Sequence, residues 1–209
     1  MLAAVAGGGR RCGKLTDGVA KSSCMAQDAV VVIDVQNAIL DLPGTQRRRE
    51  IHAALDALVG RIAILIGRAR QRNVPVIFVQ HDGPSGHRLE RGVPGWQIRQ
   101  EILPAPGEPI VHKTACDAFF ETTLGLELTS GKIDRLIVAG CMTEYCVDTT
   151  VRRAVSLGYD VTLVADGHMT ADSGALMFDQ IIAHHNSLLD GFDAGNHSVR
   201  VVPVSRCLM

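Results

Sequence analysis

Short runs of β-branched residues alternate along this chain with longer segments of helical period, and this alternation constrains the fold most. The run AVVVIDV (29–35) is continuously apolar, as is typical of a strand buried on both faces. In residues 46–72, apolar side chains recur at spacings of three and four and arginines occupy the other face, which predicts an amphipathic helix. A strand followed by a helix is the unit from which parallel sheets are built.

The same alternation continues to the end of the chain. Strands are predicted at 74–80, 108–113, 135–140, 159–166 and 198–204, and helices at 118–129, 143–157 and 174–190. Gly158 stands where a helix C-terminal cap is expected. The many Gly and Pro residues of 81–108 predict a long loop with one helical turn around Trp96. Together these segments predict an α/β fold with a mostly parallel sheet covered on both faces.

One domain accounts for the length of the chain. It has 209 residues, and single α/β domains often exceed ~150 residues. Residues 1–27 are rich in Gly, Ala and basic residues without any period, so we predict a disordered arm there and the folded domain over 28–209. A net charge of -1 and an aromatic content of 4% give no reason to expect a nucleic-acid partner. No apolar run reaches the ~18 residues of a membrane span.

The cysteines and the first residues bear on location and cofactors. The six cysteines are scattered and form no C-x-x-C pair, which disfavours a disulfide scaffold or a zinc site: Cys12, Cys24, Cys116, Cys141, Cys146 and Cys207. The first residues place apolar side chains before charges, the reverse of a secretion signal. Residues 8–14 match the start of a phosphate-binding loop, but Leu15 replaces the expected Ser or Thr and no strand precedes it. We therefore expect a cytoplasmic protein without a cofactor.

Three chemically capable residues stand at strand ends, where sites of open parallel sheets form. Asp34 closes the first strand, Lys113 ends the strand after the long loop, and Cys146 follows the next strand by a short turn. As an N-cap, Thr143 would put Cys146 in the first helical turn, where free N–H groups and the helix dipole favour a thiolate. A nearby carboxylate can act as general base and a lysine can stabilise the anion. The alternatives are a core thiol, a turn-capping carboxylate and a solvated lysine.

Three segments of the chain resemble the isochorismatase-like cysteine hydrolases. They are VVVIDVQN around Asp34, VHKTACDAFFETTL (111–124) and, as the most specific, LIVAGCMTEYCVDTTVRRAVSLGYDVTLVADGHMT (136–170). The resemblance covers roughly residues 28–204. It implies a three-layer, doubly wound α/β fold with a six-stranded parallel sheet, and a catalytic triad of Asp34, Lys113 and Cys146.

The resemblance also implies a backbone geometry and a reaction. It implies a cis peptide bond between Cys141 and Met142, and an oxyanion site made by the backbone N–H groups of Met142 and Cys146. The implied reaction is hydrolysis of a C–N amide-type bond in a small molecule. Cys146 attacks the carbonyl, ammonia or an amine leaves, and water releases the acid from a thioester. A homo-oligomer, either a dimer or a tetramer, is implied as well.

Differences between branches of this family narrow the chemistry. Nicotinamidases have an Asp-x-His plus His metal cluster after the second strand, whereas QHDGPSGH holds His81 and His87 in another order. We therefore expect no bound metal and no classical nicotinamidase activity. Isochorismatases that cleave vinyl ethers lack the cysteine, so Cys146 argues against that reaction. The TEYCVDTT, HDG and HHN (184–186) segments most resemble the amidohydrolase branch that includes streptothricin hydrolase.

Further residues are candidates for contact with the substrate: His81, Trp96, Phe119 and Tyr145. His81 ends the second strand and Trp96 lies on the long loop, so both are expected near the carboxyl edge of the sheet. Phe119, which follows Lys113, is a candidate for the pocket wall. The alternatives are a hydrogen-bonded loop histidine, a loop anchor and a core aromatic residue.

Two other functions stay open on the sequence alone. The first is a non-catalytic α/β binding protein of the same fold, against which the intact Asp34, Lys113 and Cys146 count. The second is a thiol redox protein that uses Cys146 together with Cys141. The redox hypothesis requires both cysteines, whereas the hydrolase hypothesis requires Cys146 alone.

Overall fold

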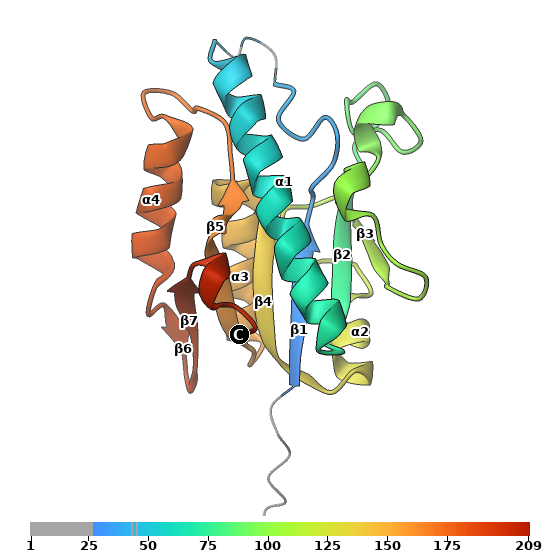
Figure 1. Cartoon of the computed structure of the whole chain (residues 1–209), viewed down its shortest axis with the longest axis vertical. Helices are drawn as coiled ribbons and strands as arrows, with labels where there is room; N and C mark the ends of the chain where they lie inside the picture. The colour runs from blue at the N-terminus through green and yellow to red at the C-terminus, as the bar shows by residue number, and fades with distance from the viewer. Residues whose placement is uncertain (1–26, 43, 45) are drawn as a thin grey trace, which may run out of the picture.

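The centre of the molecule is a sheet of seven strands in the order β3-β2-β1-β4-β5-β7-β6 (Figure 1). The computed structural model describes residues 27–42, 44 and 46–209. The strands are β1 (Gln27–Ile33), β2 (Val76–His81), β3 (Ile110–Lys113), β4 (Ile133–Cys141), β5 (Asp160–Met169), β6 (Asp193–Ala194) and β7 (His197–Val202). All neighbouring pairs from β3 to β7 are parallel, and β6 is antiparallel to β7. The predicted α/β fold is confirmed, but the expected count of six strands is too low by one.

The additional strand is a short edge segment. β6 pairs with β7 through Asp193↔Ser198 and Ala194↔His197, across a turn in which Gly195 has φ +66°. Glycine is favoured there because a positive φ costs it little. A strand of two residues is too short to show any periodic pattern, so no sequence signal marked it.

Helices cover both faces of this sheet. The α-helices are α1 (Arg48–Gln71), α2 (Leu124–Ser130), α3 (Asp148–Ser156) and α4 (Phe178–Leu189); η1 (Pro94–Trp96), η2 (Gln100–Ile102) and η4 (Val204–Arg206) are 3-10 turns, and η3 (Thr143–Val147) is a π-helical turn. In Figure 1, α1 crosses the near face of the sheet, while α2 and α3 lie behind it. The layers are those of the predicted three-layer fold.

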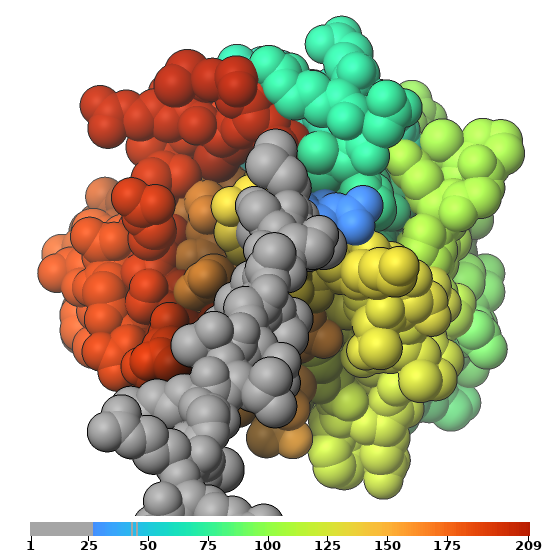
Figure 2. Space-filling model, turned by 90° about the horizontal axis from the view of Figure 1, so that it is seen from below, coloured from blue at the N-terminus to red at the C-terminus, as the bar shows by residue number. Residues whose placement is uncertain are grey.

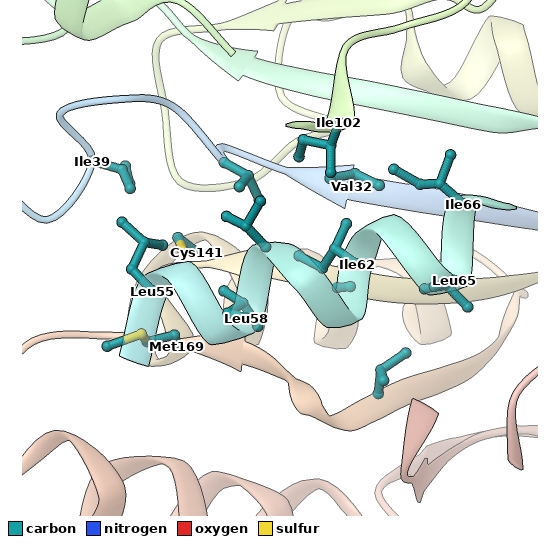
Figure 3. Packing of buried hydrophobic residues seen from close by; sticks show 14 of the residues in the cluster. Val32, Ile39, Leu55, Leu58, Ile62, Leu65, Ile66, Ile102, Cys141 and Met169 are labelled. Atoms are coloured by element: carbon teal, nitrogen blue, oxygen red, sulfur yellow. The ribbon is translucent and has the colours of Figure 1, made fainter. Parts of the chain in front are cut away.

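The central strand β1 packs into a separate hydrophobic cluster on each face of the sheet. Val30 and Val32 belong to the cluster under α1, whereas Val31 and Ile33 belong to the cluster on the α2–α3 side. Figure 3 shows the first cluster, in which α1 side chains such as Leu58 pack over the strands. Because both faces are covered from Ala29 onward, every later position of β1 favours an apolar residue, which explains the uninterrupted run in the sequence.

Helix α2 begins later than its sequence pattern predicts. It starts at Leu124 instead of residue 118. The Thr122 hydroxyl donates to the Ala118 carbonyl, and Glu121 adopts φ 53°, so the chain turns before the helix begins. Local side-chain hydrogen bonds compete with helix formation in this way.

The two later helices also differ in part from the prediction. The segment predicted as one helix over 143–157 is the π turn η3 followed by α3, and it ends before Gly158, which has φ +92°. Helix α4 starts at Phe178 rather than at 174 because Asp172 accepts the Phe178 N–H at 2.8 Å. The first turn of α4 is therefore fixed by a residue that precedes it.

Both ends of the strands can be located in the figures. Figure 2 shows the end where β1 starts, drawn in blue beside the last part of α1 in teal. The carboxyl ends of the parallel strands lie at the opposite end, at the top of Figure 1. The predicted arm lies outside the described residues except for Gln27, which begins β1; the match to a phosphate-binding loop at 8–14 lies outside them too. Among the helices of the described ranges, none has both the length and the hydrophobicity to cross a bilayer.

Candidate active site

Three strands of the parallel sheet deliver the predicted triad to one place. Asp34 directly follows β1, Lys113 is the last residue of β3, and Cys146 lies in η3, just after β4. Gly140 of β4 has φ +134°, and a Cβ added there would overlap the backbone of Ile33. Glycine therefore allows β4 to pass close to β1 just before the turn that carries the cysteine.

The lysine lies between the other two residues. Its Nζ is 2.6 Å from Asp34 Oδ2 and 3.2 Å from Cys146 Sγ, and it also donates to the Ala115 carbonyl at 2.9 Å. Asp34 is 0%, Lys113 2% and Cys146 9% exposed. The structure therefore brings together a carboxylate, an ammonium group and a thiol in a site with almost no solvent contact.

Burial and mutual charge set the protonation of this cluster. Burial raises the pKa of Asp34, and the neighbouring Lys113 opposes that shift. Burial alone would lower the pKa of Lys113, but the interactions with Asp34 and Cys146 together outweigh burial and the pKa is raised. Burial and then Asp34 raise the pKa of the Cys146 thiol, with Lys113 acting against them. These directions run against the expectation of a thiolate favoured by a helix start, because burial and Asp34 both disfavour the charged form of Cys146.

The turn η3 differs from the predicted helix start. Met142 precedes the turn, and the Thr143 side chain does not cap it; instead, Thr143 Oγ1 lies 2.9 Å from His168 Nδ1. The Met142 carbonyl accepts the N–H groups of Tyr145 and Val147 at 3.1 and 3.2 Å. The peptide bond between Cys141 and Met142 is cis. Within the described part of the chain, no hydrogen bond uses the Met142 N–H.

A cavity of about 340 Å³ opens onto Cys146 and Asp34. Two of the predicted substrate contacts, His81 and Tyr145, line it, and so does Met142. The remaining lining residues come from several loops: Ile39, Leu42, His87, Arg88, Leu89, Cys116, Glu144, Ala171, Asp172 and Ser173. The lining mixes apolar side chains with charged and hydrogen-bonding ones, and such a mixture suits a small polar molecule.

Trp96 and Phe119, also predicted as substrate contacts, lie elsewhere. Trp96 Nε1 donates to Asp82 Oδ1 at 2.7 Å, and its ring stacks on His112 with centroids 5.8 Å apart. It lines a second cavity of about 660 Å³. Phe119 packs into the core on the α2–α3 side, with its ring 6.0 Å from that of Tyr159. Neither ring lines the cavity at Cys146, because tertiary contacts hold one on the loop and the other in the core.

His81 approaches the lysine of the cluster. Its Nδ1 is 3.4 Å from Lys113 Nζ, and burial lowers the pKa of its ring, with Lys113 adding to that effect. A neutral ring can accept a hydrogen bond from Lys113 Nζ at Nδ1. Its proton is then on Nε2, which can act as a donor. His87 lies near it, with ring centroids 6.5 Å apart. The Leu89 N–H donates to His87 Nδ1 at 3.2 Å, so this nitrogen is already used.

The described residues contain no group of three His, Cys, Asp or Glu side chains arranged to hold a metal ion. Four cysteines within the described ranges are free thiols: Cys116, Cys141, Cys146 and Cys207. Cys141 is fully buried, and burial is the main reason why the pKa of its thiol is raised.

Several lining residues were missed in the sequence. Ala171, Asp172 and Ser173 lie just beyond the carboxyl end of β5, and the rule that sites form at such ends would have found them. Arg88 gave no such signal. Its Nε donates to the Ala38 carbonyl at 2.9 Å, which shapes the cavity wall through a contact between two loops.

The chain is similar in sequence to several known proteins. The isochorismatase domain family matches residues 28–181. A streptothricin hydrolase of Streptomyces noursei is 36% identical over 144 residues, which is 69% of this chain and 50% of that protein. A ureidoacrylate amidohydrolase of Variovorax paradoxus is 26% identical over 173 residues, covering 68% of each chain.

Solved structures of isochorismatase-family proteins are also similar to this chain. The crystal structure of an isochorismatase from Pseudomonas putida has a TM-score of 0.75 and 30% identity, covering 86% of this chain and 89% of that one. The chain spans about half the length of the streptothricin hydrolases it matches, with 50% and 55% of them covered. The family match extends over most of the chain and includes β2 to β5 and most of β1. The chain belongs to the isochorismatase family.

Proposed function

We propose that this protein is a cysteine-dependent amidohydrolase that cleaves a C–N amide-type bond in a small molecule through a thioester. The observation that carries the proposal is the buried contact of Asp34, Lys113 and Cys146 at the end of an open cavity. The relatives named as streptothricin hydrolase and ureidoacrylate amidohydrolase support hydrolysis of such bonds.

The first half of the reaction forms the thioester. Cys146 Sγ bonds to the substrate carbonyl carbon while the thiol proton passes to Asp34, the carboxylate that lines the same cavity. The carbonyl oxygen becomes an oxyanion, which the N–H groups of Met142 and Cys146 bind and the charge of Lys113 stabilises. The C–N bond then breaks, and Asp34 returns its proton to the leaving nitrogen as ammonia or an amine departs.

The second half regenerates the enzyme. Asp34 takes a proton from a water molecule as the water oxygen bonds to the thioester carbon. The C–S bond breaks, the acid leaves, and the proton on Asp34 returns to Cys146 Sγ. A thiol with a raised pKa suits this order of events, because attack and proton transfer to the carboxylate occur together. His81 and Tyr145 line the cavity and contact the substrate in this scheme.

The test uses alkylation of each cysteine by iodoacetamide, read by peptide mapping, and needs no substrate. Asp34 raises the pKa of the Cys146 thiol, so Asp34→Asn is expected to make Cys146 alkylation faster near neutral pH. Lys113 lowers that pKa, so Lys113→Met is expected to make it slower. Glutathione in the same reaction serves as the reference thiol, because the exposed Cys116 also lines the cavity. Equal rates of Cys146 alkylation in the wild type and both variants would contradict the proposal that the three residues act together.

Turnover is then measured on a panel of small amides. Both variants and Cys146→Ser are expected to lose hydrolysis, even though Asp34→Asn makes the thiol more reactive. Cys141→Ser is the matched control, because Cys141 is fully buried and lines no part of the cavity. Loss of activity in Cys141→Ser together with loss of a reversible disulfide would favour redox chemistry over hydrolysis.

A further inference from the structure

A buried histidine lies next to the nucleophile turn but outside the triad. His168, on β5, is 2% exposed. Its Nδ1 is 2.9 Å from Thr143 Oγ1 and its Nε2 is 2.9 Å from Asn186 Oδ1. The ring thus connects η3 to α4 through β5. The reaction proposed above gives this histidine no role.

The proton positions in this chain of side chains follow from chemistry. Asn186 Nδ2 donates to the Ala165 carbonyl at 2.9 Å, which leaves Oδ1 facing His168. An amide oxygen only accepts, so His168 Nε2 carries a proton. Burial lowers the pKa of His168 to about 4, which keeps the ring neutral and makes Nδ1 an acceptor. The Thr143 hydroxyl therefore donates to His168.

Thr143 is the member of this hydrogen-bonded series that lies in the turn carrying Cys146. It is 1% exposed and is the first residue of η3, three positions before Cys146. The turn makes no side-chain cap hydrogen bond of its own at its start. Single π-helical turns are uncommon and depend on their surroundings. The bond from Thr143 to His168 is a side-chain contact from outside the turn that holds its first residue.

We propose that Asn186, His168 and Thr143 form a positioning relay that holds η3, and with it the Cys146 thiol, in place against Lys113. The catalytic consequence rests on the proposed amidohydrolase function, whereas the effect on the thiol does not. The 3.2 Å contact between Lys113 Nζ and Cys146 Sγ is the distance that the relay maintains. A shift of the turn also moves the Cys146 N–H away from the oxyanion.

The alternative is a buried polar cluster that supports the fold but does not position the thiol. Thr170 provides the matched control for this alternative. It directly follows β5, is 0% exposed, and its Oγ1 has no hydrogen-bond partner within the described residues. Thr170→Val and Thr143→Val each remove one buried hydroxyl, but only Thr143→Val breaks the relay.

The experiment measures Cys146 alkylation, kcat and KM in Thr143→Val, Thr143→Ser and Thr170→Val, with thermal unfolding of each. Displacement of a catalytic group can cost ~10²-fold. We expect Thr143→Val to slow alkylation and lower kcat by ~10-fold or more, with KM little changed. Thr143→Ser keeps the hydroxyl and is expected to restore both. Thr170→Val is expected to match the wild type in both.

The possible outcomes distinguish failure of the relay from failure of the amidohydrolase proposal. If Thr143→Val matches Thr170→Val in alkylation rate and kcat, the relay is overturned, even if Thr143→Val unfolds at a lower temperature. If Thr143→Val does not fold, the milder Asn186→Ala carries the test, and an unchanged Cys146 rate there overturns the relay. If Cys146 alkylation changes in the relay variants but the wild type hydrolyses no amide, the relay stands and the amidohydrolase proposal fails.

Discussion

Two groups of charged side chains lie at the ends of β1, β2 and β3, and only one of them opens onto the cavity. The first is the triad around Lys113. The second, which we call the loop cluster, consists of Asp82 with Trp96, His112 and Arg91 around it. Each has an acidic residue just after a strand and a basic partner on or near β3. Residue type and position along the strand therefore do not distinguish them.

Solvent contact and access to the cavity distinguish the two groups. The Asp34 and Lys113 side chains are both 0% exposed, whereas those of Asp82 and His112 are 19% and 33% exposed. Asp82 is also occupied, because it accepts from Trp96 and lies 3.1 Å from His112 Nδ1. The loop cluster fastens the long loop to the sheet, while the triad opens onto the cavity.

A single step along β3 separates the two groups. His112 and Lys113 are neighbours, and successive side chains of a strand point to opposite faces. Lys113 turns towards Asp34 and Cys146, and His112 turns towards the loop. The comparison teaches that the strand pleat, more than residue type, decides which charged group becomes part of the site.

The largest expected effect comes from replacing the lysine. Lys113→Met leaves Asp34 buried without its cation, and breaking such a pair typically costs about 3–5 kcal/mol. The charge that stabilises the oxyanion is lost as well, so turnover is expected to fall ~10³-fold or more. Chemical denaturation and amide hydrolysis measure the two effects. His112→Gln is the neighbouring control, and equal loss of turnover in it would break the comparison.

The next effect is on the pH dependence of the thiol. Asp34 helps to raise the pKa of Cys146, so Asp34→Asn is expected to move the midpoint of Cys146 alkylation to lower pH. Asp82→Asn removes a carboxylate of the loop cluster, which lies outside the cavity lining, and is expected to leave the midpoint unchanged. A similar shift in both variants would mean that the charge of Asp82 also affects the pKa of Cys146.

A smaller effect is expected from the loop cluster itself. Trp96→Phe keeps an aromatic ring over His112 but removes the hydrogen bond to Asp82. We expect a loss of about 1 kcal/mol in the free energy of unfolding, since the carboxylate is partly exposed. Turnover is expected to stay at the wild-type level. A fall in kcat without loss of stability would restore Trp96 as a substrate contact.

The smallest effect is expected at the rim of the same cluster. Arg91 Nε is 3.7 Å from Asp82 Oδ2, and the arginine side chain is 62% exposed. Exposed ion pairs contribute little, so Arg91→Gln is expected to change the free energy of unfolding by less than ~0.5 kcal/mol. Denaturation at low and high salt checks this, and a clear salt-dependent loss would show that the pair matters.

The fold was largely predictable because long periodic segments carry strong signals. The β1 run and the 24-residue α1 pack as their patterns predicted. The start of α2 was not predictable, because it depends on the Thr122 hydroxyl, a local competitor of the helix. The two residues of β6 depend on pairing with β7 and have no pattern of their own.

The site, like the fold, was predictable where strand positions decide it and not where single contacts do. Asp34, Lys113 and Cys146 come together because parallel strands bring their carboxyl ends to one edge. Trp96 and Phe119 do not line the cavity, since contacts distant in sequence decide where loop and core rings lie. Thr143 was expected to be a cap, but its partner His168 is 25 residues away and no spacing rule connects them.

The complete burial of Lys113 has a practical consequence for following the protein in solution. Only two lysines lie in the described ranges, Lys113 with a 0% exposed side chain and the exposed Lys132. An amine-reactive tag can reach Lys132 in the native molecule but needs an opening of the site to reach Lys113. The ratio of the two tagged peptides over time therefore measures how often the buried cluster around Lys113 opens to solvent.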